Sequence, residues 1–477
     1  MEASSLLIAP RTDLPVSEPW LPSEPSRASA SYEDALAFWY GRVNYEQLAP
    51  KPSDLKLDRM RALLGLLGDP HDRLRIVHVA GSKGKGSTSA MLAAVLRHAG
   101  YRTGLFTSPH LGRVEERVQV DGQSISRAEL TLLLDEIRDR VAAVPKSLDG
   151  LTFFEIATAV GFLHFVRRRV ETAVIEVGLG GRFDSTNVCK SAVSLICSIS
   201  IDHTRQLGNR PANIAFEKAG IVKPGRPAIS GATAPEPREV IERVCRERGS
   251  SLRQLGVDFR YAYKPGHVEE AGSARVALFT RSRAHITTSR GAWPEMELGL
   301  LGEHQAANAA VAVACVEELR EQGWRIDDDA VASGLADVRW PARMEIVGRK
   351  PFIVLDCAHN VASVEALVET LLSSFPPARR WLIFAGSGDK ELAGMFQVLA
   401  PHFQHAFLTR YQNSPRGVTP EDLAHLLARS ESIPFTLCRT PAEALAAARM
   451  QAGVDDLVCI TGSVFLAGEM RPMLVPV

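Results

Sequence analysis

The 477-residue sequence has no long hydrophobic run, no excess of charge of either sign and no closely spaced pair of cysteines. No apolar stretch approaches the roughly 20 residues that a membrane-spanning helix needs. Lysine plus arginine equals aspartate plus glutamate at 55 each, so the net charge gives no indication of a nucleic-acid or membrane partner. We also find no internal repeat of fixed period. These absences argue against membrane, repeat and nucleic-acid-binding proteins.

The cysteines are scattered, and several of them lie inside apolar runs. This arrangement argues against a zinc site and favours buried free thiols in a reducing compartment. The first 30 residues show no positively charged start followed by an apolar stretch, so we expect no signal peptide. We interpret residues 1–30 as a flexible arm and expect the protein to be cytoplasmic.

A chain of this length requires more than one domain. A strand-like run at 74–79 leads into a glycine-rich turn, and a helical pattern at 88–98 follows it. Two short β-branched runs at 172–177 and 192–199 are typical of strands buried on both faces. These features predict a doubly wound α/β domain of the P-loop type with parallel strands.

The next segments differ in pattern. Residues 225–300 hold short alternating runs with glycine and proline between them, which predicts a β-rich excursion, and 302–319 predicts an alanine-rich helix. Strands and helices then alternate again, as in a smaller Rossmann-like α/β domain. Its strands are expected at 352–356, 381–385, 406–409, 435–438 and 457–461. We therefore expect a first domain at 31–338 and a second domain at 342–477. No heptad pattern or exposed apolar stripe stands out, so we expect a monomer.

The strongest local signal is the string HVAGSKGKGST at residues 78–88. Glycines let the backbone turn so that its N–H groups face a phosphate, and the following helix N-terminus adds partial positive charge. A lysine in such a loop can reach the β- and γ-phosphates, and a hydroxyl can bind Mg²⁺. The residues assigned to nucleotide binding in this loop are Gly81, Gly84, Lys85, Gly86, Ser87 and Thr88.

The loop departs from the standard P-loop because Gly86 separates Lys85 from Ser87. The string GSKGKGST resembles the phosphate loop of folylpolyglutamate and dihydrofolate synthases, members of the Mur ligase superfamily, in which this additional glycine is typical. Further strings in the same order extend the resemblance over about residues 32–470. The resemblance implies a ligase that uses ATP and Mg²⁺.

The resemblance also implies a metal site. The string EVGLGGRFDSTN at 176–187 is similar to the signature in which the glutamate binds magnesium, which assigns Glu176 beside Ser87. His203 matches a histidine ligand of the family, although imidazole is an unusual partner for Mg²⁺. Lys218 matches a lysine that the superfamily carries as a carbamate, which would serve a second metal ion. An ordinary helix lysine in an ion pair is the alternative.

The second domain is implied to complete the nucleotide site. The resemblance assigns Asn308 to the adenine end, Arg343 to the phosphates from the domain junction, and Asp356 to nucleotide contact. His359 is assigned to the ATP or glutamate side. Cys357 stands where the family usually has glycine, and a positive φ there would strain it.

The implied reaction activates a carboxylate as an acyl phosphate and joins it to L-glutamate, with Lys85, Arg343, Lys218 and His359 as catalytic groups. The acceptor is dihydropteroate for a dihydrofolate synthase and the γ-carboxylate of a reduced folate for a folylpolyglutamate synthase. The sequence does not decide between one and both activities; compactness favours both. A cell-wall precursor ligase is one alternative, but about 75 residues before the loop are too few for its extra domain. A P-loop switch is the other, and it would need no acceptor.

Overall fold

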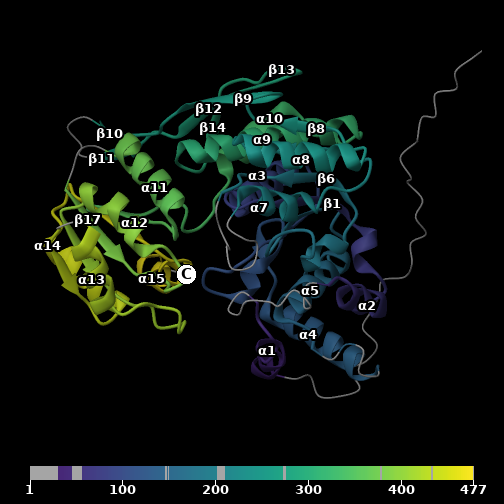
Figure 1. Cartoon of the computed structure of the whole chain (residues 1–477), viewed down its shortest axis with the longest axis horizontal. Coiled ribbons are helices and arrows are strands. Elements are labelled where there is room, and N and C mark those ends of the chain that lie inside the picture. The colour runs from purple at the N-terminus through teal and green to yellow at the C-terminus, as the bar shows by residue number, and fades with distance from the viewer. Residues whose placement is uncertain are drawn as a thin grey trace, which may run out of the picture.

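The computed structural model describes residues 31–45, 56–144, 148, 150–200, 210–271, 276–375, 379–430 and 433–475. The chain forms two α/β domains that lie side by side, with the smaller one at the C-terminal, yellow-green end of the chain (Figure 1). Across the described ranges, no helix is long and apolar enough to cross a membrane. The expected arm at 1–30 lies outside the described residues.

An eight-stranded sheet in the order β4-β3-β2-β5-β1-β6-β7-β8 forms the centre of the larger domain. Its strands are β1 Arg75–Ala80, β2 Thr103–Phe106, β3 Val118–Val120, β4 Gln123–Ser124, β5 Thr172–Glu176, β6 Ser191–Ile196, β7 Ala228–Ser230 and β8 Leu252–Gln254. Six of them pair in parallel, and β3 and β4 form an antiparallel edge. The predicted strands at 74–79, 172–177 and 192–199 are confirmed as β1, β5 and β6.

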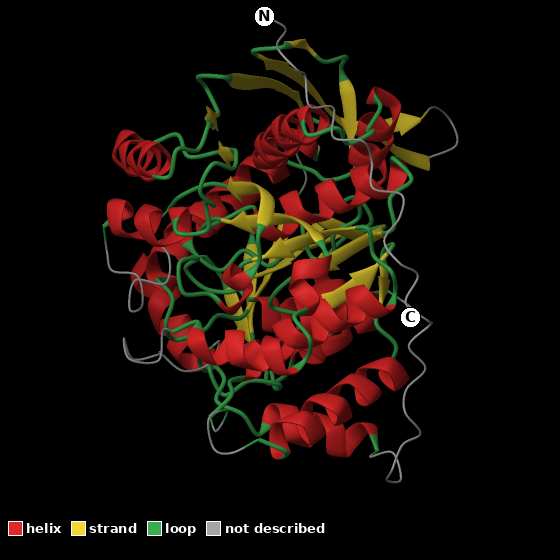
Figure 2. Cartoon of the chain, turned by 90° about the vertical axis from the view of Figure 1, so that its right-hand side faces the viewer, coloured by secondary structure: helices red, strands yellow, loops and turns green. Residues whose placement is uncertain are grey.

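Helices cover both faces of this sheet, as Figure 2 shows. They are α1 Tyr32–Tyr40, α2 Asp58–Leu66, α3 Lys85–His98, α4 Arg127–Ala142, α5 Phe153–Arg167, α7 Pro211–Ala219, α8 Pro235–Glu247, α9 Glu303–Glu321 and α10 Asp328–Asp337. Alternate residues of β1 serve the two faces: Ile76 packs in the core with α1, α2, α4 and α5, and Val77 and Val79 pack with α3, α9 and α10. Burial on both faces explains why these strands are apolar runs.

The segment at 225–300 is only partly the predicted β-rich excursion. An antiparallel sheet is formed by β9 Phe259–Lys264, β12 Ser282–Thr288, β13 Gly291–Ala292 and β14 Met296–Leu298, and a separate hairpin by β10 Val268–Ala271 and β11 Val276–Phe279. Before β9, however, the chain continues the eight-stranded sheet through β7, α8 and β8. Pro235 and Pro237 do not interrupt this segment, because they lie in the first turn of α8, where proline needs no hydrogen-bond donor.

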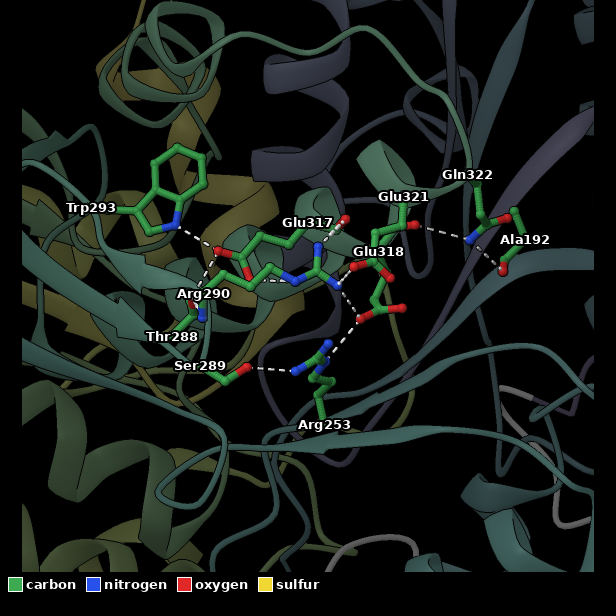
Figure 3. Close-up of polar contacts among 10 residues, drawn as sticks. All are labelled: Ala192, Arg253, Thr288, Ser289, Arg290, Trp293, Glu317, Glu318, Glu321 and Gln322. Atoms are coloured by element: carbon green, nitrogen blue, oxygen red, sulfur yellow. Dashed lines mark hydrogen bonds and ion pairs between the residues drawn. The ribbon is translucent and has the colours of Figure 1, made fainter. Parts of the chain in front are cut away.

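The antiparallel sheet is attached to α9 by a cluster of charged side chains (Figure 3). Glu317 is buried and accepts hydrogen bonds from Thr288 Oγ1 at 2.8 Å and Trp293 Nε1 at 2.9 Å. Arg290 Nη2 lies 3.2 Å from Glu318 Oε1, and Arg253 Nε lies 2.9 Å from the same oxygen. Glu317 is therefore an acceptor that joins the antiparallel sheet to α9.

Replacement of Glu317 by alanine is expected to lower the free energy of unfolding by about 2–4 kcal/mol, because it leaves the buried Trp293 N–H without its acceptor and Thr288 with only a 3.4 Å contact to the Gly291 carbonyl. Urea denaturation measures the change. Glu321→Ala is the matched control, since its side chain is 59% exposed and pairs only with Arg290 in the drawn cluster; we expect less than about 1 kcal/mol there. Equal losses in the two variants would contradict the assignment.

The smaller domain holds a six-stranded sheet in the order β15-β16-β20-β17-β18-β19. Its elements are β15 Glu345–Arg349, β16 Phe352–Leu355, α11 Val361–Ser374, β17 Arg380–Phe384, α12 Leu392–Leu399, β18 His405–Leu408, α13 Pro420–Ser430, β19 Phe435–Leu437, α14 Pro441–Gln451, β20 Leu457–Thr461 and α15 Val464–Leu474. All five predicted strands are confirmed, and they pair in parallel. Sequence reasoning missed β15, an antiparallel edge strand. All seven cysteines of the chain are free and buried, as predicted.

Candidate functional site

The phosphate loop joins the end of β1 to the start of α3, as predicted. Gly81 and Gly84 have φ angles of 152° and 83°, which favour glycine. A Cβ at Gly81 would lie 2.8 Å from Cys197 Cβ, and one at Gly84 would overlap Asn308 Oδ1. Lys85 Nζ donates to the Gly81 carbonyl at 3.1 Å, so its ammonium group lies over the loop. The backbone of the loop is thus shaped by close packing against neighbours on both sides.

Replacement of Gly84 by alanine is expected to weaken nucleotide binding about tenfold or more. A left-handed alanine costs about 1–2 kcal/mol, and its Cβ would displace Asn308. Calorimetric titration with a non-hydrolysable ATP analogue measures the change. Gly100→Ala is the control, because Gly100 has a similar φ of 86° but no atom within 4 Å of its Cβ position. Nucleotide affinity of wild-type strength in Gly84→Ala would contradict this account of the loop.

Glu176 lies at the carboxyl end of β5, the strand that pairs with β1 on the side of β2. It is 3% exposed, and its Oε2 accepts a hydrogen bond from the Ser108 backbone N–H at 3.2 Å. Burial raises its pKa from the usual 4.5 to about 7, while the nearby charges of Lys85 and Arg343 act in the opposite direction. Side chains from three separate motifs therefore act on one another electrostatically at this edge of the sheet.

The loop that follows Glu176 is fastened to α7, the helix of Lys218. Asn187 Nδ2 donates to the Arg182 carbonyl at 2.9 Å and to the Gly220 carbonyl at 3.1 Å. A Cβ at Gly181 would lie 3.1 Å from the Lys218 Cα, so glycine allows the loop to lie against the helix. Lys218 itself is 2% exposed. Much of the 176–187 signature therefore serves to place α7.

The metal site is described only in part. His203 falls in 201–209, outside the described residues. Within the described part of the chain, no group of three or more His, Cys, Asp and Glu side chains could hold a metal ion. Ser87 is buried at the start of α3, and Glu176 offers a buried carboxylate, which is a hard oxygen ligand suited to Mg²⁺. The assignment of Ser87, Glu176, His203 and Lys218 stays a prediction.

Arg343 comes from the start of the smaller domain and is held in an unusual turn. Its neighbours Ala342 and Met344 both have left-handed backbones, with φ angles of 53° and 48°. Asp356 Oδ2 accepts from the Met344 N–H at 2.9 Å, so this carboxylate fixes the turn. Burial lowers the pKa of Arg343, whereas the charges of Asp356 and Glu176 raise it. Such left-handed non-glycine residues often occur at functional sites.

The residues that follow β16 lie against the Arg343 turn, although Cys357 replaces the glycine that is usual in the family. Cys357 does not adopt a positive φ, so the family glycine is replaced without strain of that kind. Its sulfur contacts Arg343 Nη1. His359 Nδ1 lies 2.9 Å from the Cys357 carbonyl oxygen, which orients the ring. Asn308, on α9, donates to Gln305 Oε1 at 3.0 Å and lies against Gly84 of the phosphate loop.

A doubly wound domain with a phosphate loop, joined to a second α/β domain that supplies an arginine, defines a Mur ligase. Family models agree: the Mur ligase middle domain matches residues 79–316, and the Mur ligase glutamate ligase domain matches residues 342–464. The chain belongs to the dihydrofolate synthase/folylpolyglutamate synthase family, whose members are ATP-dependent glutamate ligases.

The enzyme named dihydrofolate synthase/folylpolyglutamate synthase from Bacillus subtilis is 34% identical over 447 residues, 93% of this chain and 99% of that protein. The structure of Escherichia coli FolC in complex with DHPP and ADP matches with a TM-score of 0.80 at 29% identity, over 94% of this chain and 99% of that one. A bifunctional Yersinia pestis synthase complexed with AMPPNP and Mn ion matches with a TM-score of 0.79 at 27% identity, over 94% of this chain and all (100%) of that one.

Proposed function

We propose that this protein joins L-glutamate to dihydropteroate and to the γ-carboxylate of reduced folates, using ATP and a divalent metal ion. The observation that carries the proposal is that Lys85 of the phosphate loop and Arg343 of the other domain both lie within electrostatic reach of the buried Glu176. Two cations and a buried carboxylate around a phosphate loop suit a γ-phosphoryl group and its metal ion. The ligands named for the Escherichia coli and Yersinia pestis structures support it.

In the proposed reaction, the acceptor carboxylate attacks the γ-phosphorus of ATP and ADP leaves. Lys85 and Arg343 stabilise the charge on the transferring phosphoryl group. The amine of glutamate then attacks the acyl carbonyl, loses a proton, and inorganic phosphate leaves. A metal ion bound by Ser87 and Glu176, with His203 and Lys218, would neutralise phosphate oxygens. The facing domains would exclude water, which would otherwise hydrolyse the acyl phosphate.

Lys218 is proposed to carry a carbamate, formed from its neutral amine and CO₂ with release of a proton. The match to the superfamily lysine supports this, as does the position of α7 against the Gly181 loop that follows Glu176. The number of metal ions, one or two, depends on this modification. A signal for the carbamate in a ¹³C NMR spectrum after loading with labelled bicarbonate, absent in Lys218→Arg, would support it. Absence of this signal from both spectra would leave the ion-pair alternative.

The function is tested by ADP release from purified protein with Mg²⁺, ATP and glutamate, adding dihydropteroate or tetrahydrofolate in turn. Turnover that requires both glutamate and an acceptor is expected, and turnover with each acceptor would show both activities. Turnover that is indifferent to acceptor and glutamate would overturn the ligase proposal. The predicted monomer and cytoplasmic location are separate proposals, tested by light scattering and by cell fractionation.

A further inference from the structure

The turn that presents Arg343 is supported from behind by a second charged pair. Glu345 Oε2 accepts the backbone N–H of Ala342 at 2.8 Å, on the residue that precedes Arg343. Arg471 of α15 in turn donates to Glu345, through Nε at 3.0 and 3.1 Å and Nη2 at 2.8 Å. Their side chains are only 21% and 32% exposed. An arginine with such a forked contact holds the carboxylate in one orientation.

The same face of α15 meets the larger domain. Gly468 lies three residues before Arg471, and a Cβ at this position would overlap the carbonyl oxygen of Leu111. Leu111 also packs against the apolar cluster of the smaller domain that includes Leu466 and Met470. In Figure 1, α15 lies on the side of the smaller domain that faces the larger one. The contact therefore joins the domains.

The Leu111 loop is itself connected to the phosphate site. Glu116 accepts the backbone N–H groups of Leu111 at 2.8 Å and Arg113 at 2.9 Å, which makes the turn rigid. At the start of this loop, the Ser108 N–H donates to Glu176. Hydrogen bonds to Glu345 raise the pKa of Arg471, and the charge of Glu116 adds to the effect. One face of α15 thus contacts elements that lead to both sides of the phosphoryl-transfer site.

We propose that Arg471 is a positioning residue for Arg343, and that the contact between Gly468 and Leu111 sets the domain spacing at which Arg343 reaches the phosphates. The proposal rests on the proposed function, because Arg343 must act on the transferring group. Arg471 touches no reacting atom; it acts through Glu345 and the Ala342 backbone. The docking of α15 therefore couples the relative position of the domains to phosphoryl transfer.

A double-mutant cycle in kcat tests the positioning role. Arg471→Ala is expected to lower kcat about 10- to 100-fold, because a displacement of about 1 Å has this effect on a positioned group. In an Arg343→Ala background, the same change should lower kcat by less than about twofold, since the positioned group is gone. Losses that multiply in the double variant would overturn the proposal.

Arg379→Ala is the matched control for charge and stability. Arg379 Nη2 also pairs with a carboxylate of the smaller domain, Asp456, at 3.0 Å, but this pair has no contact with the Arg343 turn among the hydrogen bonds of the described residues. Its kcat should equal that of the wild type. If the wild-type protein shows no glutamate-dependent turnover, the proposed function is contradicted. A different result would count against the positioning role alone: the wild type is active, Arg343→Ala has a lowered kcat, and Arg471→Ala keeps the wild-type kcat.

Gly468→Ala gives a second measurement that keeps Arg471 in place. Alanine within a helix normally stabilises it relative to glycine, so the smaller domain should not lose stability. The added methyl group would push Leu111 away and lower kcat about tenfold or more, with wild-type affinity for ADP. Gly65→Ala in α2 is the control, since its Cβ would meet no atom within 4 Å. Wild-type kcat in Gly468→Ala would overturn the spacing role. This measurement remains decisive even if Arg471→Ala fails to fold.

Discussion

Replacement of Arg343 by alanine is expected to lower kcat by about 10³-fold, at the lower end of what an arginine contributes to phosphoryl transfer. The guanidinium group is half-buried and lies within the electrostatic reach of Glu176. Lys85 and Arg117, which also act on that carboxylate, belong to the larger domain. Asp356 holds Met344 through a backbone N–H, and this contact survives the substitution. The turn should therefore persist without its cation.

Single-turnover measurement of ADP formation with saturating acceptor and glutamate gives the relevant rate. Arg343→Lys should recover only part of the activity, because an ammonium group lacks the planar fork of guanidinium. Arg339→Ala serves as the control for loss of a positive charge from the same segment, since Arg339 is exposed. Equal rates for Arg343→Ala and Arg339→Ala would show that Arg343 does not act on the phosphates.

Replacement of Glu176 by glutamine is expected to abolish most of the metal-dependent turnover, by about 10²-fold or more, yet to stabilise the ligand-free protein. Burial raises the pKa of this carboxyl from 4.5 to about 7. The folded state therefore prefers the protonated form, and ionisation above the unfolded pKa opposes folding. Glutamine has nearly the same shape as glutamate and can still accept the hydrogen bond from the Ser108 N–H, but it carries no charge.

The sign of this effect fixes its pH dependence. The destabilisation is absent below about pH 4.5, grows as the pH rises, and is complete above about pH 7 at roughly 3 kcal/mol. Urea denaturation without metal at pH 5 and pH 8 should show a stability gain for Glu176→Gln that is larger at pH 8. Glu115→Gln is the control: it removes a buried carboxylate that accepts from Tyr32 Oη at 2.6 Å, so no gain is expected. A Glu176→Gln protein that is less stable at pH 8 would contradict the assignment.

The local parts of the site could be predicted from the sequence because each lies within one short string. A strand, three glycines and a lysine are enough to specify the phosphate loop, and Glu176 directly ends an apolar strand run. The inner strands of the smaller domain, β16, β17, β18 and β20, were equally clear, since burial on both faces leaves a β-branched or apolar run. Cys357 was the one expected difficulty, and its backbone avoids it.

The parts that could not be predicted depend on contacts between distant residues. Glu345 and Arg471 are 126 residues apart, and neither has a local pattern that distinguishes it from an exposed charged residue. The edge strand β15 is half-buried and short, which leaves a weak alternation. The prolines of α8 indicate a loop when read alone, whereas the buried Val240 and Ile241 behind them belong to a helix. Tertiary packing decides each of these cases.

The buried thiols give the protein its own reporters of local opening. They are distributed over both domains, at Cys189, Cys197, Cys245 and Cys315 in the larger one and at Cys357, Cys438 and Cys459 in the smaller one. An enclosed thiol is alkylated only while its surroundings open, so labelling rates follow the opening free energy at each site. Pulse alkylation followed by peptide mass mapping would therefore order the opening of the two domains without any added probe. Labelling at Cys357 would report on the sulfur that contacts Arg343.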